Sequence, residues 1–164
     1  MLATLLVGYP WLAPLAFIAL LAAGPALGRW LAPRRSLTLG LLVATVALVC
    51  AIVFFPTGRT MAVECTLSWM LPLPTRPEPF ANVVLFVPLG YLTALLTRRP
   101  VVAAIAAIGA SACIEATQAL LPALGRSCTT NDLFANALGA IIGAALGAIG
   151  LALHRGRAPE QARA

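Results

Sequence analysis

Residues 133–153 read LFANALGAIIGAALGAIGLAL and contain no charged side chain. A transmembrane helix needs about 20 mainly apolar residues, because each residue adds about 1.5 Å and the hydrocarbon core is about 30 Å thick. The run is therefore long enough to cross a membrane once. Gly139, Gly143 and Gly147 recur in steps of four, which places them on one helix face. Such a seam of small residues lets another membrane helix approach closely.

Four more apolar runs of similar length precede this one, and the fourth of the five carries a single charge, Glu115. The predicted spans are Leu5–Leu27, Leu37–Phe55, Phe80–Thr97, Val101–Leu121 and Leu133–Leu153. Of the 164 residues, 61% are hydrophobic and 10% are charged, whereas soluble domains carry about 25% charged residues. The sequence therefore predicts an all-α polytopic membrane helix bundle of about five helices, and it excludes an ordinary soluble enzyme.

The predicted domain organisation is simple. Residues 1–155 form one integral membrane domain, and residues 156–164 form a short polar tail that we expect to be disordered and cytoplasmic. A removable signal peptide is the alternative interpretation of the first run. Because signal peptides begin with a basic segment and residues 1–9 contain no Lys or Arg, a retained helix is favoured.

The arginines predict the orientation, since cytoplasmic loops carry the excess of Lys and Arg. All 11 basic side chains are Arg. With the N-terminus outside, those inside are Arg29, Arg34, Arg35, Arg98, Arg99, Arg155, Arg157 and Arg163, and those outside are Arg59, Arg76 and Arg126. We therefore expect a multi-pass protein of the plasma (inner) membrane with its N-terminus out and its C-terminus in. The net charge of +6 then indicates membrane lipid, and not nucleic acid, as the partner.

Six polar side chains from three segments are predicted to meet at the outer face. They are Asn82, Glu115, Gln118, Arg126, Asp132 and Asn136. An ionised carboxylate within the bilayer costs several kcal/mol unless it is paired, so this polar network should face the bundle interior. Arg126 offers a planar fork of donors for phosphate or carboxylate, and Glu115 and Asp132 are candidate partners for it or proton-exchanging groups. Asp132 also suits the N-cap of the last helix.

The third span carries Phe86, Pro88 and Gly90. Pro88 should free a backbone carbonyl about one turn earlier, and Gly90 permits a bend or a close contact. Broken membrane helices occur where backbone lines a cavity, so we expect a break in this segment.

The residue inventory gives no standard catalytic pair, because Ser127 and Thr129 have no nearby His and the single His is His154. Whether the protein is an enzyme is left open, and neither a cofactor nor a metal is expected. A bridge between Cys65 and Cys128 is one option, since both are predicted outside, where disulfides form. The cysteines within the spans, Cys50 and Cys113, are expected in the core.

The chain carries three motifs in order. NVVLFVPLG gives Asn82-x3-Phe86-x-Pro88-x-Gly90, CIEATQALLPALGR gives Glu115-x2-Gln118 followed by Arg126, and RSCTTNDLFANALGAIIG gives Arg126-x5-Asp132-x3-Asn136-x2-Gly139-x3-Gly143. Over about residues 50–150, their order and spacing resemble the VanZ-like family of small bacterial integral membrane proteins. This resemblance implies a cell-envelope protein, in a family named for a protein associated with teicoplanin resistance. Members often have acidic residues where this chain has Thr129 and Asn131, which argues against a metal role here.

Three functions are compatible with these observations. The first is binding or modification of a cell-surface or lipid-linked ligand, such as an envelope precursor or a glycopeptide antibiotic, by the outward-facing polar residues. The second is a small transporter or flippase, although five spans without an internal repeat argue against alternating access by one chain. The third is a structural membrane scaffold, in which the polar network only holds helices together.

Overall fold

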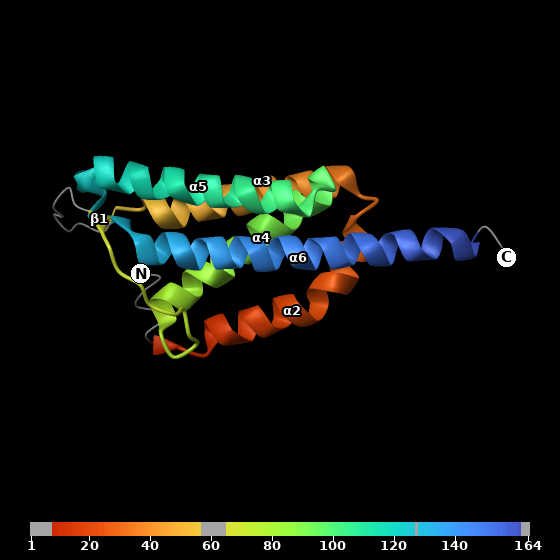
Figure 1. The fold of residues 1–164 in the computed structure, drawn as a ribbon, viewed down its shortest axis with the longest axis horizontal. Coiled ribbons are helices and arrows are strands. Elements are labelled where there is room, and N and C mark those ends of the chain that lie inside the picture. The colour runs from red at the N-terminus through yellow and green to blue at the C-terminus, as the bar shows by residue number, and fades with distance from the viewer. Residues whose placement is uncertain (1–7, 57–64, 127, 162–164) are drawn as a thin grey trace.

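The computed structural model describes residues 8–56, 65–126 and 128–161, with side chains as far as residue 156. Over this part of the chain, five helices are long and apolar enough to cross a membrane, as predicted. They are α2 (Leu12–Leu31), α3 (Arg35–Phe54), α4 (Pro77–Thr97), α5 (Pro100–Leu120) and α6 (Thr130–Gln161). Successive helices run in alternate directions along the long axis (Figure 1).

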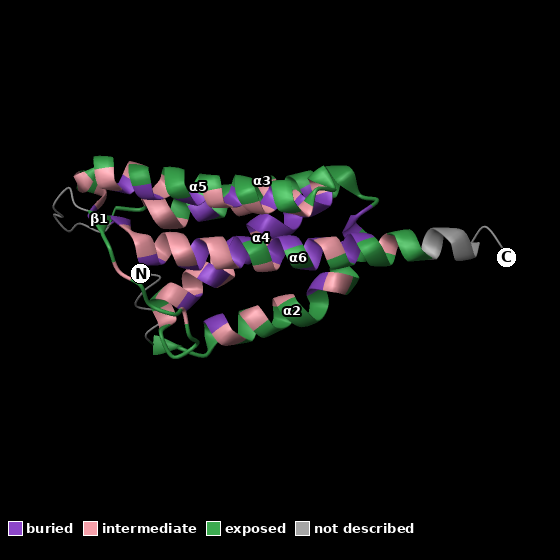
Figure 2. Ribbon diagram, viewed as in Figure 1, coloured by how far each residue is buried: buried purple, intermediate pink, exposed green. Residues whose placement is uncertain are grey.

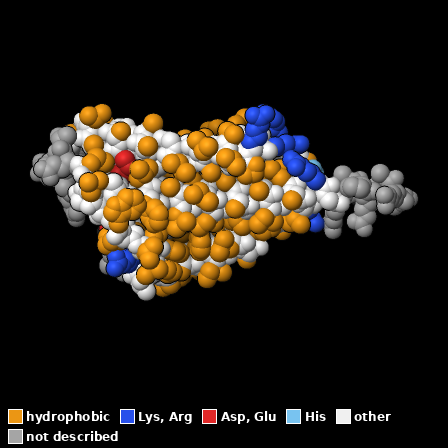
Figure 3. Space-filling view, viewed as in Figure 1, with side chains coloured by type: hydrophobic (Ala, Val, Ile, Leu, Met, Phe, Trp, Pro, Cys, Tyr) orange, Lys and Arg blue, Asp and Glu red, His pale blue; other side chains and the backbone are white. Residues whose placement is uncertain are grey.

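The alternation gives the bundle two distinct ends. We call one the basic end, which holds the turns at residues 32–34 and 98–99, and the other the loop end, which holds residues 65–76 and 121–129. Most of the arginine side chains visible in Figure 3 gather at the basic end. Because the polar residues are predicted on the side opposite the arginines, we expect them at the loop end.

Helix α4 occupies the centre of the bundle and contacts each of the other four long helices. Half of its membrane window is buried inside the protein, compared with 11% for α3. Figure 2 shows the buried residues on α4 and on the facing side of α6, with exposed residues over much of α3 and α5. The exposed surface of these outer helices is apolar, as expected for helices in contact with lipid.

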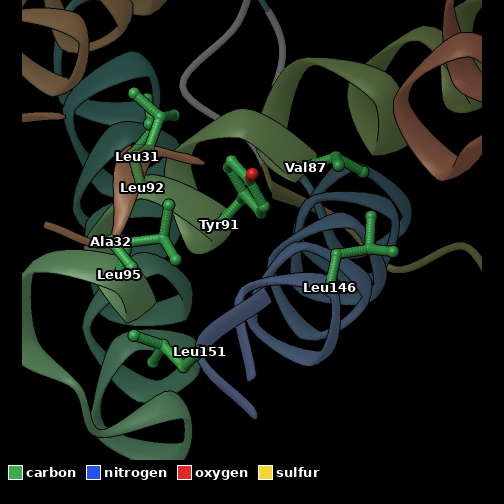
Figure 4. Packing of buried hydrophobic residues seen from close by; sticks show 8 residues of the cluster. All are labelled: Leu31, Ala32, Val87, Tyr91, Leu92, Leu95, Leu146 and Leu151. Carbon is green, nitrogen blue, oxygen red and sulfur yellow. The ribbon is translucent and has the colours of Figure 1, made fainter. Parts of the chain in front are cut away.

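Helix α2 joins the centre through a cluster of buried apolar residues (Figure 4). Its members are Leu31, Ala32, Val87, Tyr91, Leu92, Leu95, Leu146 and Leu151. The hydroxyl of Tyr91 donates a hydrogen bond of 2.8 Å to the carbonyl of Gly24, so the polar tip of this ring is satisfied inside the cluster. The cluster ties α2, α4 and α6 together.

The predicted glycine seam is present and it faces α4. A Cβ atom on Gly139 would collide with the carbonyl oxygen of Val83, and one on Gly143 would collide with that of Val87. From the other side, a Cβ atom on Gly90 would collide with the backbone of Ala140. The backbones of α4 and α6 therefore touch, and only glycine fits at these positions.

The break expected at Pro88 does not occur, because α4 is helical throughout Pro77–Thr97. A proline in a helix interior removes one backbone hydrogen bond and crowds the preceding turn. Here the segment is clamped on both sides of the proline, since Phe86 is fully buried and Gly90 lies against α6. Dense packing against a neighbouring helix keeps the segment helical across the proline, as membrane helices permit.

Two predicted boundaries also differ from the structure. The first long helix begins at Leu12 and not at Leu5, and residues 1–7, with the question of a retained N-terminus, lie outside the described residues. Helix α6 continues to Gln161, so residues 156–161 of the predicted disordered tail are helical. Polar residues end a membrane span, but they do not have to end the helix. Once a helix is formed, each further residue adds a backbone hydrogen bond, so the helix can extend into water.

The loop end is closed by a disulfide between Cys65 and Cys128, whose Cα atoms are 4.6 Å apart. These residues begin two short parallel strands, β1 (Cys65–Thr66) and β2 (Cys128–Thr129). The sequence left undecided whether these two cysteines are bridged, and in the structure they are. The placement of Cys50 and Cys113 in the core was wrong, because both lie exposed on the outer surface of the bundle. In a membrane protein, lipid can supply the apolar surroundings of such side chains.

Candidate functional site

All six predicted polar residues lie at the loop end. Asn82 is in the second turn of α4, Glu115 and Gln118 are in the last turns of α5, Asp132 and Asn136 are in the first two turns of α6, and Arg126 is in the connection between α5 and α6. That connection contains the short 3-10 helix η1 (Pro122–Leu124) and Gly125, whose φ of 62° turns the chain toward Arg126. The structure brings the six into two groups, described in turn below.

The first group surrounds the N-terminus of α6. Thr129, and not Asp132 as predicted, is the N-cap, because its Oγ1 accepts a 3.0 Å hydrogen bond from the backbone N–H of Asp132. The N–H of Thr129 itself donates to Oε2 of Glu115 at 3.0 Å. Glu115 therefore places a carboxylate from α5 at the positive end of the α6 dipole, where negative charge is stabilised. The side chain of Glu115 is only 7% exposed.

Asp132 connects this group to α4. Its Oδ1 accepts a 2.6 Å hydrogen bond from Nδ2 of Asn82. Asp132 also lies within electrostatic range of the carboxylate of Glu115 and of the guanidinium of Arg126. Two carboxylates and one amide from three different helices are therefore linked around Thr129 and Asp132.

Asn136 lies one helical turn deeper along the same face of α6. Its Nδ2 donates a 2.9 Å hydrogen bond to the hydroxyl of Ser111 on α5, and Ser111 lies one turn below Glu115. The amide oxygen Oδ1 of Asn136 is buried, since the residue is only 4% exposed, and it has no hydrogen-bond partner among the described residues. Because helical side chains lean toward the N-terminus of their helix, Asn136 leans toward the turn that holds Asp132.

The second group joins α5 and the following connection to the C-terminal end of α3. Nε2 of Gln118 donates to the carbonyl of Val53 at 3.0 Å. Arg126 donates from Nη2 to the carbonyl of Ile52 at 2.6 Å and from Nε to that of Phe55 at 3.5 Å. The last carbonyls of a helix have no partner within the helix, and α3 has no basic residue in its last turn. Gln118 and Arg126 therefore cap α3.

This finding changes the role expected for Arg126. The sequence suggested a fork for phosphate or carboxylate, with Glu115 and Asp132 as its partners. Among the residues that the structure describes, its hydrogen bonds go to backbone carbonyls of α3. The helix C-terminus carries partial negative charge, so it competes with carboxylates for the guanidinium.

Four polar residues of the site were not predicted as members. They are Ser111, Thr129, Thr130 and Asn131. The hydroxyl of Thr130 bonds both the backbone N–H and the carbonyl of Ser68, and Oδ1 of Asn131 accepts from the N–H of Met70 at 2.9 Å. The pattern Thr129-x-x-Asp132 could have identified the cap, because hydroxyl residues are typical N-caps. The pair Cys65 and Cys128 was the signal in the sequence that could have joined the loop to the start of α6.

The atoms that the first group leaves available to a ligand are hydrogen-bond acceptors. Oε1 of Glu115 has no hydrogen-bond partner among the described residues, and neither has Oδ1 of Asn136. On the face shown in Figure 3, acidic side chains form one small spot near the loop end, surrounded by apolar side chains. No three His, Cys, Asp or Glu residues in the described part of the chain could hold a metal ion together.

Comparison with known proteins gives one match. The model of a family described as VanZ/LLP1 matches residues 41–151. This stretch holds every residue of both groups, together with the glycine seam. No curated protein and no solved structure matches the chain significantly.

Proposed function

The chain belongs to the VanZ/LLP1 family and is a multi-pass membrane protein, and from this premise we propose that it binds a molecule of the bacterial cell envelope. The site is the first polar group at the loop end, which faces outward from the plasma membrane in this proposal. By the family resemblance, the ligand class includes glycopeptide antibiotics of the teicoplanin type and lipid-linked envelope precursors, and the role is in resistance.

The observation that carries this proposal is the unpartnered Oδ1 of Asn136. A buried polar atom without a partner costs about 1–3 kcal/mol, and buried polar atoms in native proteins are almost always satisfied. The atom lies next to Ser111 and one turn below the Glu115 and Asp132 carboxylates. A bound group that donates a hydrogen bond would remove this cost.

The nature of the free atoms indicates the kind of ligand group. Oε1 of Glu115 and Oδ1 of Asn136 both accept hydrogen bonds. The nearby donors of Gln118 and Arg126 are directed to α3. The site therefore favours an ammonium, hydroxyl or amide N–H group over a phosphate or carboxylate. Glycopeptides and peptide-bearing envelope precursors both present such donors.

The test uses glycopeptide-sensitive cells that express the chain, with teicoplanin susceptibility as the readout at matched protein levels. Glu115→Gln removes the charge and Asn136→Leu removes the amide with little change in shape. Either variant should lower resistance, because Glu115→Gln removes the charge from its hydrogen bond and Asn136→Leu removes an acceptor, each worth about 1 kcal/mol or more, roughly fivefold or more in affinity. Direct binding of teicoplanin to the purified variants should fall in the same proportion.

The matched control is Arg76→Gln, which removes one charge at an exposed position of the same end. It should leave both resistance and binding at the level of the unmodified chain. Equal resistance in cells carrying Glu115→Gln, Asn136→Leu and the unmodified chain would reject the proposed site.

A scaffold role is the second candidate, and one observation favours it. Gln118 and Arg126 are fully explained by the capping of α3, and Asn82 by its bond to Asp132. If the network only holds helices together, every effect of Glu115→Gln on resistance should follow protein abundance. A loss of resistance at unchanged abundance separates the binding role from the scaffold role.

A further inference from the structure

A small open cleft lies at the basic end, on the far side of the bundle from the polar groups. It is lined by Ala32, Arg35, Thr38, Leu95, Leu96 and Arg98. The apolar residues Ala32 and Leu95 are buried beneath it, whereas Arg35 and Arg98 are exposed at its rim. The two guanidinium groups come from α3 and from the turn between α4 and α5, so the tertiary structure brings them to one cleft.

Among the residues whose side chains the structure describes, no acidic group lies near the positive charge of this cleft. The five acidic residues of the chain are Glu64, Glu78, Glu115, Asp132 and Glu160. Of these, the ones with described side chains, Glu78, Glu115 and Asp132, all lie at the loop end. Two like charges that share a cleft repel each other, and a bound anion would convert this repulsion into attraction.

The backbone at this end carries partial charges of both signs, because α3 and α5 begin there and α2 and α4 end there. Helices α3 and α5 both begin at the basic end, and neither has a side-chain cap or an acidic residue in its first turn. The first N–H groups of a helix carry partial positive charge and lack partners within the helix. Arg98 itself has a φ of 55°, the single positive value at a described non-glycine residue, and this conformation fixes where its side chain leaves the turn.

We propose that this cleft binds the phosphate of an anionic lipid headgroup, with Arg35 and Arg98 as its ligands. Arginine suits phosphate because its planar fork donates two parallel hydrogen bonds. Basic pockets between membrane helices bind anionic headgroups by this chemistry. Trp30 lies in the last turn of α2, two residues before Ala32 of the cleft lining, with the guanidinium of Arg34 4.1 Å from its ring centre, as expected for an aromatic at headgroup depth. The apolar wall from α4 faces the glycerol and upper acyl chain.

Trp30 provides a local reporter of lipid at this cleft. The other tryptophans, Trp11 and Trp69, lie toward the loop end, so the double variant Trp11→Phe and Trp69→Phe leaves one fluorophore near Arg35 and Arg98. The experiment measures quenching of this protein in non-ionic micelles by phosphatidylglycerol and by phosphatidylcholine, each carrying bromine on its acyl chain. Phosphatidylglycerol should quench with roughly tenfold higher apparent affinity.

The cleft variant, Arg35→Gln with Arg98→Gln, should reduce that preference to about twofold or less. The control, Arg99→Gln with Arg155→Gln, removes the same amount of charge from the same end but outside the cleft. It should retain most of the preference for phosphatidylglycerol. Arg98→Gly is a further variant that should keep the fold, because glycine suits the positive φ, and it should weaken the preference by itself.

Four outcomes decide the proposal. Equal quenching by the two lipids in the unmodified background would overturn it, and so would equal losses in the cleft and control variants. Displacement of phosphatidylglycerol by millimolar inorganic phosphate would reject the lipid as the source and assign the same two arginines to a soluble phosphate. Persistence of the lipid signal in phosphate, with its loss in the cleft variant, supports the headgroup site.

Discussion

Arg126, in the connection between α5 and α6, and Glu115, in α5, each act at the end of another helix. The Arg126 guanidinium lies on the carbonyl end of α3, and the Glu115 carboxylate lies on the N–H end of α6. Each charge therefore meets the helix terminus of opposite sign, and the two side chains satisfy backbone groups that have no partner within those helices. This arrangement gives both side chains polar partners inside a sparsely charged membrane protein without a direct bond between them.

The capping role of Arg126 can be measured as stability. Arg126→Met should lower the free energy of unfolding by about 1–2 kcal/mol, because it leaves the last carbonyls of α3 without a charged donor. Thermal unfolding of the purified protein in detergent micelles gives the comparison. Arg76→Met, at an exposed position of the same end, is the matched control and should cause little change. If Arg126→Met kept full stability but lost ligand binding, Arg126 would instead belong to the binding site.

At the scale of the elements, the contact between α4 and α6 organises the bundle. Gly139 and Gly143 of α6 lie against the carbonyls of Val83 and Val87, and Gly90 of α4 lies against Ala140. Lipid is as apolar as most side chains, so helices in a membrane associate through close packing and polar contacts. The seam therefore fixes the position of α4, and with it the position of Asn82 next to Asp132.

Gly143→Ala tests this seam. The added methyl group would meet the backbone of Val87, which cannot move aside as a flexible side chain can. We expect a loss of about 1–3 kcal/mol in the free energy of unfolding, the usual cost of overpacking. Gly40→Ala is the control, since nothing lies within 4 Å of a Cβ atom there, and alanine should be neutral or slightly stabilising in α3. Similar stabilities of the two variants would contradict a close α4–α6 contact.

At the scale of the whole molecule, two independent features point to the same orientation. Arginines gather at the basic end, which the positive-inside rule places in the cytoplasm. The disulfide between Cys65 and Cys128 lies at the loop end, and disulfides persist in oxidising compartments outside the cytoplasm. Both observations support the proposal that the loop end and its polar residues face outward.

Cysteine labelling tests this orientation in intact cells. In a background with Cys50→Ala and Cys113→Ala, the bridged cysteines are the two that remain. A maleimide that cannot cross the membrane should label neither thiol before reduction, and both after mild reduction, without permeabilisation. Labelling that requires permeabilised cells would place the loop end in the cytoplasm and reverse the proposed topology.

The sequence by itself determined the fold class, the five spans, the end of the bundle that holds the polar residues, and the glycine face of α6. These properties follow from local composition and from the helical period, which need no knowledge of neighbours. Only the tertiary structure decided the partners: Arg126 with the end of α3, Ser111 with Asn136, and the loop with α6 through Cys65 and Cys128. Spacing along the chain fixes a side chain's face and depth, but its hydrogen-bond partner depends on how helices distant in sequence pack together.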